Sequence, residues 1–167
     1  VLEVTGAAEV DLVCHSLGGL VARTYVDLLG GHSHVRRVVT LGTPHRGLSH
    51  AGHRLGASVR DMQPRTGFIA RLDSAPPRET FRYHSIFSAH DNIVFPSSAS
   101  SLGHRGTDIL VHRHGHFGIL FSEEVADHVH LALTANGPHG GPKTSEDGGP
   151  EEIPVPLENE PRRSVAG

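Results

Sequence analysis

Residues 10–23, VDLVCHSLGGLVAR, place a serine between a short apolar run and two glycines. The run VDLVC at 10–14 is rich in β-branched residues and predicts a buried strand of a parallel sheet. After Ser16 the apolar residues recur at helical spacing as far as Gly30 and Gly31, which predict the end of a helix. Ser16 therefore stands where a strand turns into a helix.

A serine on such a turn has the surroundings that a nucleophile needs. Its hydroxyl attacks only after a base takes its proton, and the oxyanion that follows must be stabilised. The backbone N–H of Leu17, at the start of the predicted helix, would point toward that oxyanion. We expect the strand and the helix to crowd together two positions on either side of the serine, so that small residues are needed there. Gly18 is small enough, Gly19 gives additional room, and Cys14 is compact. The alternative is that the serine only caps the helix.

The rest of the chain alternates between strands and helices. The pattern predicts further strands at 35–41, 82–88 and 108–113, and helices at 51–63, 67–73 and 118–133. This order predicts an α/β fold in which helices cover a parallel sheet. Ser122, followed by two glutamates, favours the first turn of the last helix.

Composition limits the class of protein. The 167 residues suffice for about one domain, and the net charge of −3 gives no reason to expect nucleic acid as a partner. The single cysteine, Cys14, excludes an intrachain disulfide. The chain has no apolar run long enough for a transmembrane helix and no visible signal peptide. From residue 135 it is rich in glycine, proline and acidic residues, so we expect a domain over 1–134 and a disordered tail over 135–167.

Several motifs, taken together, resemble those of the α/β-hydrolases, specifically bacterial triacylglycerol lipases and esterases. The resemblance covers about residues 1–130 and rests on CHSLG, LGTPHRG, DMQPRTGFIARL, SIFSAHDNIVFP and GHFGIL, in that order. The first of these is similar to the nucleophile elbow G-x-S-x-G, with cysteine in place of the first glycine. The resemblance implies a carboxylic ester hydrolase of this fold, without a metal or organic cofactor, that acts on lipid or small esters.

The resemblance also implies roles for particular residues. Ser16 would be the nucleophile, Asp91 the acid and His116 the general base, in the order along the chain that this family shows. The backbone N–H of Leu17 would hold part of the oxyanion. The reaction would pass through an acyl-enzyme intermediate, as in other serine hydrolases.

Other readings of the same residues remain open. His114 competes with His116, and only the family pattern of Gly-His before an apolar residue favours the latter. Asp108 competes with Asp91, but it opens a strand and so suits a capping role. His15 is flanking scaffold rather than a second base. A histidine-rich metal-binding module is the alternative from another class, because His112, His114 and His116 alternate as zinc ligands could; no cysteine or acid joins them at ligand spacing.

The segment 46–80 lies where this fold inserts a cap or lid. Met62 and Phe68 in this segment would bind an acyl chain or pack the lid against the body. His45 and Arg46, in the GTPHRG stretch where this segment begins, are expected to be scaffold near the site.

The family's sheet has strands before the elbow strand, and a loop after one of them supplies a second oxyanion donor. We therefore expect the sequence to be the C-terminal part of something longer, or truncated at its N-terminus, with the missing strands supplied in cis or by a partner. The strand at 10–14 would otherwise be an open apolar edge. By itself the chain is expected to be poorly soluble, with little or no esterase activity.

Two alternatives of function remain on the same fold: a truncated and catalytically silent remnant, or an acyltransferase or thioesterase. By resemblance we expect an extracellular protein that makes transient contact with a lipid surface.

Overall fold

The computed structural model describes residues 1–48, 67–76 and 82–135. The predicted helix at 51–63, Met62 and the tail from residue 136 lie outside these ranges, as does most of the predicted lid segment.

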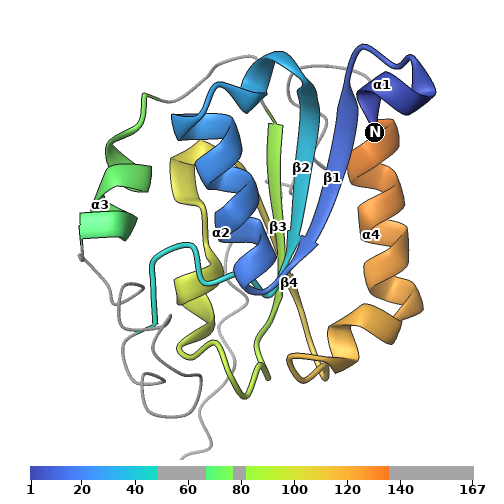
Figure 1. Ribbon diagram of the computed structural model, residues 1–167. Helices are drawn as coiled ribbons and strands as arrows, with labels where there is room; N and C mark the ends of the chain where they lie inside the picture. The colour runs from blue at the N-terminus through green and yellow to red at the C-terminus, as the bar shows by residue number, and fades with distance from the viewer. Residues whose placement is uncertain (49–66, 77–81, 136–167) are drawn as a thin grey trace, which may run out of the picture.

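The core of the fold is a parallel sheet of four strands that lie side by side in chain order (Figure 1). Their bounds are β1 (Val10–His15), β2 (Val35–Leu41), β3 (Arg82–Ser88) and β4 (Thr107–Val111). Parallel neighbours need crossover connections, and helical segments lie between successive strands. The predicted α/β class with a parallel sheet is confirmed, and the last strand ends two residues earlier than expected.

Four α-helices accompany the sheet in the described residues: α1 (Leu2–Thr5), α2 (Leu17–Arg23), α3 (Gly67–Ser74) and α4 (Glu123–Thr134). After α2 the chain continues into a π-helical turn at Thr24–Leu28, and Gly30 follows in the left-handed conformation with φ 79°. The helix predicted from residue 17 is thus present, with a wider last turn. No helix in the described ranges is long and apolar enough to cross a membrane.

The last helix begins later than predicted. Residues 118–121 form a 3₁₀ turn, and α4 starts only after Ser122. The hydroxyl of Ser122 accepts a hydrogen bond from the backbone N–H of Val125, at 3.4 Å, so the serine is the N-cap of α4. The preference of serine for the cap position places the boundary here.

Helices α2 and α4 lie on opposite sides of the sheet (Figure 1). Side chains of a strand alternate between its two faces, so Val38 of β2 joins the cluster under α2 and Val39 joins the cluster under α4. The cluster on the α2 side contains Ala22, Val26, Val35, Val38, Tyr83 and Leu102. The cluster on the α4 side contains Val39, Leu41, Ile86, Val111, Ile119, Val125 and Ala132. These two layers give a three-layer α/β arrangement.

Strand β1 lies at one edge of this sheet. Among the described residues it pairs with β2 alone. Its side chains are partly buried, and Val13 is 49% exposed. The expected burial of the strand at 10–14 is therefore only partial, and within the described residues its outer edge pairs with no other strand, as also expected.

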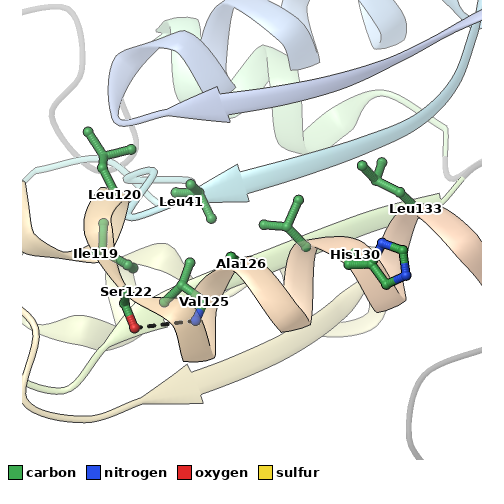
Figure 2. Close-up of a pocket in the computed structure, with 9 residues that line it drawn as sticks. Leu41, Ile119, Leu120, Ser122, Val125, Ala126, His130 and Leu133 are labelled. Atoms are coloured by element: carbon green, nitrogen blue, oxygen red, sulfur yellow. Dashed lines mark hydrogen bonds between the residues drawn. The ribbon is translucent and has the colours of Figure 1, made fainter.

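An apolar groove runs along α4 beside the end of β2, with a volume of about 320 Å³. In Figure 2, Leu41, Ile119, Leu120 and Val125 lie along it, with Leu133 at its far end. The helix therefore does not close completely over this part of the sheet.

Arg37 of β2 joins the sheet to the end of α4. Its guanidinium donates hydrogen bonds to the carbonyl oxygens of Leu133 and, at 2.7 Å, Ala135. The last carbonyl groups of a helix lack partners within the helix and carry partial negative charge, so a cation here both pairs them and favours the helix dipole. Arg37 is 7% exposed, which makes these hydrogen bonds shielded from water.

Replacing Arg37 tests how much its hydrogen bonds to the end of α4 contribute to stability. We expect Arg37→Met to lower the free energy of unfolding by roughly 2 kcal/mol, because hydrogen bonds to a charged group are lost while the apolar stem remains. Arg36→Met is the matched control, since Arg36 is exposed and pairs with Asp11 at the surface. Urea denaturation of both variants checks the prediction, and equal losses would contradict it.

Candidate active site

Ser16 occupies a strained turn between β1 and α2. Its backbone has φ 54° and ψ −127°, a conformation that residues with a side chain rarely adopt. Such a residue costs about 1–3 kcal/mol and persists only where its surroundings hold it. The side chain makes no capping hydrogen bond to α2, so the structure does not support the capping role.

The strained turn is held by β2 and the loop that follows it. The backbone N–H of Ser16 donates to the carbonyl oxygen of Leu41 at 2.9 Å. The hydroxyl of Thr43, which is fully buried, donates to the carbonyl oxygen of Ser16 at 2.7 Å. Both polar groups of the serine backbone are thus fixed from the neighbouring strand. Thr43 belongs to the LGTPHRG segment, but no pattern in that segment distinguishes it from its neighbours.

The two glycines after the serine differ in a way that corrects the prediction. A Cβ at Gly18 would meet only Cys14, at an ordinary 3.9 Å. A Cβ at Gly19 would lie 2.2 Å from the hydroxyl oxygen of Thr43 and 2.9 Å from a methyl group of Thr40. The position that must stay small is therefore Gly19, because the helix passes closest to β2 there. The ordinary spacing between positions 14 and 18 explains how a cysteine fits at 14.

The structure brings Ser16, Asp91 and His116 together. The Nε2 atom of His116 lies 2.9 Å from the Ser16 hydroxyl, and its Nδ1 atom lies 2.8 Å from the Asp91 carboxylate. The three residues follow β1, β3 and β4, and the carboxyl ends of parallel strands meet at one edge of a sheet. The ring bridges the two oxygens, as a general base between a nucleophile and an acid must.

The surroundings of the Asp91 carboxylate favour its ionised form. Its other oxygen accepts hydrogen bonds from the backbone N–H groups of Ile93 and Val94, each at 2.8 Å. Burial raises the pKa of Asp91, but the hydrogen bonds from His116 and from these N–H groups outweigh it and leave that pKa below its usual range. An ionised Asp91 accepts from Nδ1–H of His116, which leaves Nε2 free to accept from the serine.

Gly42 lies directly against this hydrogen bond. Its φ is 55°, and an added Cβ would lie 3.2 Å from the Asp91 carboxylate and 3.4 Å from Nδ1 of His116. Any side chain would press on the pair and strain the backbone as well. The turn-rich sequence after β2 was the only sign of this role.

The competing residues have other partners. Nε2 of His114 lies 3.2 Å from Glu124 and 3.1 Å from the Ser122 hydroxyl. Asp108 accepts from the Ser101 hydroxyl and from the backbone N–H of Leu102, so it fixes the turn before β4, as its position at the start of a strand suggested.

The ring of His112 lies beside that of His90, with the centroids 6.1 Å apart. No three His, Cys, Asp or Glu side chains of the described residues gather into a group that could hold a metal ion.

His45 and Arg46 belong to the framework of the loop. The Nε2 atom of His45 lies 2.9 Å from the Thr40 hydroxyl, and Arg46 donates to the carbonyl oxygen of Ser101. Burial, with the nearby charge of Arg23, lowers the pKa of His45 well below its usual range, so the ring is neutral. These contacts agree with the scaffold role expected from the sequence.

Arg23 is a buried ion that the sequence analysis did not single out. The side chain is 1% exposed and donates to the carbonyl oxygens of His45 and Leu72, at 3.3 and 3.2 Å, and to Asp73. It thereby joins the loop after β2 and helix α3 to the far end of α2. It lines a cavity of about 660 Å³ with Ile69, Asp73 and Arg105. The spacing of Arg23, three residues from both Leu20 and Val26, indicates that it shares their inward face, and this signal could have identified it.

Phe68 is on α3 and packs toward α2. It lies against the buried cluster of Leu20, Ile69 and Leu72, together with Leu17. This is the packing alternative given for the lid segment; Met62 lies outside the described residues.

Cys14 is partly buried, and burial raises the pKa of its thiol, which agrees with a small apolar residue rather than a reactive one.

A parallel sheet with a serine elbow at its carboxyl edge defines the α/β-hydrolase fold, and solved structures are similar to this chain. The mature form of a Bacillus licheniformis lipase matches with a TM-score of 0.61 and 20% identity, over 79% of this chain and 67% of the lipase. Its propeptide form gives a TM-score of 0.63 at 20% identity, over 81% of this chain and 38% of that one. The esterase domain of a Rhodothermus marinus protein gives 0.52 at 20% identity, over 79% and 61%. The predicted resemblance to esterases and lipases of this fold is confirmed.

The family is defined more narrowly by sequence. A model described as palmitoyl protein thioesterase matches residues 2–86, which is just over half of the chain. The chain belongs to this family. The match includes Ser16 and the loop after β2, whereas Asp91 and His116 lie beyond it.

The difference between the two glycines gives a matched test of the elbow. We expect Gly19→Ala to lower the free energy of unfolding by about 1–3 kcal/mol, because the new methyl group displaces the buried Thr43 side chain. Gly18→Ala should leave it unchanged or raise it by up to about 1 kcal/mol, because Gly18 is exposed and helical. Urea denaturation measures both, and a Gly18 effect as large as that of Gly19 would refute the assignment.

The lowered pKa of Asp91 predicts how its contribution depends on pH. A carboxyl group whose pKa is lower in the folded state stabilises that state above its unfolded pKa of about 3.9 and loses this effect as the pH falls through the folded value. Asp91→Asn should therefore cost about 2 kcal/mol at pH 7. The difference from wild type should shrink below about pH 4. Unfolding curves from pH 7 to 3, with the exposed Asp127→Asn as control, measure this; a difference that is constant down to pH 3 would contradict it.

Proposed function

We propose that this protein is a serine hydrolase that cleaves carboxylic esters of lipids, with Ser16 as nucleophile, His116 as general base and Asp91 as the acid. One observation carries the proposal: His116 bridges the other two side chains at 2.9 and 2.8 Å, with the serine on a strained elbow. A serine that only capped a helix would have no need of a buried imidazole and carboxylate.

The proposed reaction has two halves. His116 takes the proton of Ser16 through Nε2 while the serine oxygen attacks the acyl carbon. The tetrahedral oxyanion is held in part by the backbone N–H of Leu17, the first residue of α2. His116 then gives the proton to the departing alcohol, which leaves an acyl-enzyme. Water, activated by the same ring, releases the acid and restores the serine. Asp91 keeps the ring in the useful tautomer and stabilises its cation.

Apolar surface beside the base favours an acyl substrate with a hydrocarbon chain. The ring of Phe117 packs 5.3 Å from that of His116 and remains 63% exposed. Exposed aromatic groups near a reaction site suit an apolar ligand, and we include transient contact with a lipid surface in the proposal.

A second oxyanion donor is part of the proposed chemistry and is not assigned to any of the described residues. Within the described residues, the outer edge of β1, next to Ser16, pairs with no other strand. We propose that a strand supplied in cis or by a partner pairs there and brings the second donor.

Thioester cleavage is the second candidate, and the family to which the chain belongs favours it. The same serine, histidine and aspartate would serve, because a thiolate leaves as readily as an alkoxide or more so. The acyl chain named for that family, palmitoyl, is compatible with the apolar surroundings of His116. The geometry of the site suits esters and thioesters alike, so the two are distinguished by comparing their rates of hydrolysis.

The test combines covalent labelling with a substrate panel. A fluorophosphonate probe needs only one attack by an activated serine, so we expect it to add to Ser16, as peptide mass spectrometry would show, and not to Ser16→Ala. Ser33→Ala, at an exposed serine, is the matched control. Whatever hydrolysis of p-nitrophenyl esters and of palmitoyl-coenzyme A the protein shows should be lost on Ser16→Ala. A protein that neither takes the label at Ser16 nor cleaves any ester or thioester would end the proposal.

A further inference from the structure

The residue before the nucleophile contacts the base. His15 is the last residue of β1, and its Nε2 atom lies 2.9 Å from the backbone carbonyl oxygen of His116, which is 101 positions away in the chain. The two imidazole rings are also packed, with centroids 4.7 Å apart and planes at 45°. A carbonyl oxygen only accepts hydrogen bonds, so Nε2 of His15 carries the proton of this pair.

The backbone N–H of His116 is held in a similar way. The backbone N–H of His116 donates to the side-chain oxygen of Asn92 at 3.2 Å. Asn92 directly follows Asp91, as His15 directly precedes Ser16. The backbone of His116 is therefore fixed at its N–H by the neighbour of the acid and at its C=O by the neighbour of the nucleophile.

This arrangement matters because His116 lies on a loop. Strand β4 ends at Val111 and the next helical turn begins at Gly118, so no ladder of backbone hydrogen bonds fixes the residue between them. A general base must remain within hydrogen-bond distance of the proton it takes, and a displacement of 1 Å can cost about 10²-fold in rate.

We propose that His15 is a positioning residue for the general base: its Nε2–H holds the His116 carbonyl and so keeps the His116 ring between Ser16 and Asp91. The inference rests on the proposed function. The Nε2 atom of His15 donates its proton to the His116 carbonyl oxygen, so this atom has no free lone pair with which to act as a second base. It differs from simple scaffold in that its loss alters the reaction more than the stability of the fold.

A matched pair of substitutions separates the hydrogen bond from packing. Glutamine places an amide N–H at about the reach of Nε2, whereas methionine has a similar length and no donor. In the full chain, His15→Met should lower kcat for a p-nitrophenyl ester by about 10- to 100-fold, with KM changed less than about twofold. His15→Gln should restore kcat to within a few-fold of wild type. Both variants should keep the urea midpoint of wild type within a narrow range.

A second measurement does not depend on turnover. The proton on Nδ1 of His116, shared with Asp91, should give a downfield NMR signal in wild type and in His15→Gln, and should broaden or vanish in His15→Met. If wild type neither takes the fluorophosphonate label at Ser16 nor cleaves any ester or thioester, the proposed function fails, and this signal alone decides whether His15 positions the ring.

Equal behaviour of the Gln and Met variants in kcat and in the NMR signal would overturn the proposal, as would a change confined to KM. If His15→Met does not fold, Asn92→Leu tests the opposite end of the same backbone unit. Loss of the His116 signal in that variant, with the signal kept in His15→Gln, supports positioning by the two neighbours; an unaltered signal in Asn92→Leu overturns it.

Discussion

The hydrogen bond from the Thr43 hydroxyl to the carbonyl oxygen of Ser16 is the contact on which the site depends. The serine backbone is in a conformation that local preferences oppose, and this bond, with that from Ser16 N–H to Leu41, holds it there. Gly19 must lack a side chain for Thr43 to fit. The strained backbone of Ser16 is therefore stabilised by hydrogen bonds from the neighbouring strand and its loop rather than by contacts within the turn itself.

The parallel sheet turns this local constraint into a site. One residue of the site follows the carboxyl end of each strand: Ser16 after β1, Gly42 after β2, Asp91 after β3 and His116 after β4. Gly42 leaves room for the hydrogen bond between Asp91 and His116, and the two helical layers cover the sheet that sets the spacing. The loops carry the chemistry while the strands fix the distances.

Much of this could be predicted from the sequence because the signals are local. The strands at 35–41 and 82–88 have the predicted bounds, since β-branched and apolar runs bounded by turn residues specify them. The first turn of α4 was misplaced because a short apolar 3₁₀ turn before Ser122 resembles a helix in its spacing. The choice of His116 over His114 needed the family pattern, since spacing alone treats the two alike.

By itself, then, the sequence determined the α/β class and the strand-to-helix turn at Ser16, because each depends on short-range patterns; the choice of Asp91 and His116 came from the family resemblance. Only the tertiary structure decided that Gly19 rather than Gly18 is the crowded glycine, that Thr43 and Gly42 support the site, and that His15 contacts the backbone of His116. These are contacts between residues 21 to 101 positions apart, and no local pattern of side chains records which distant groups a fold brings together.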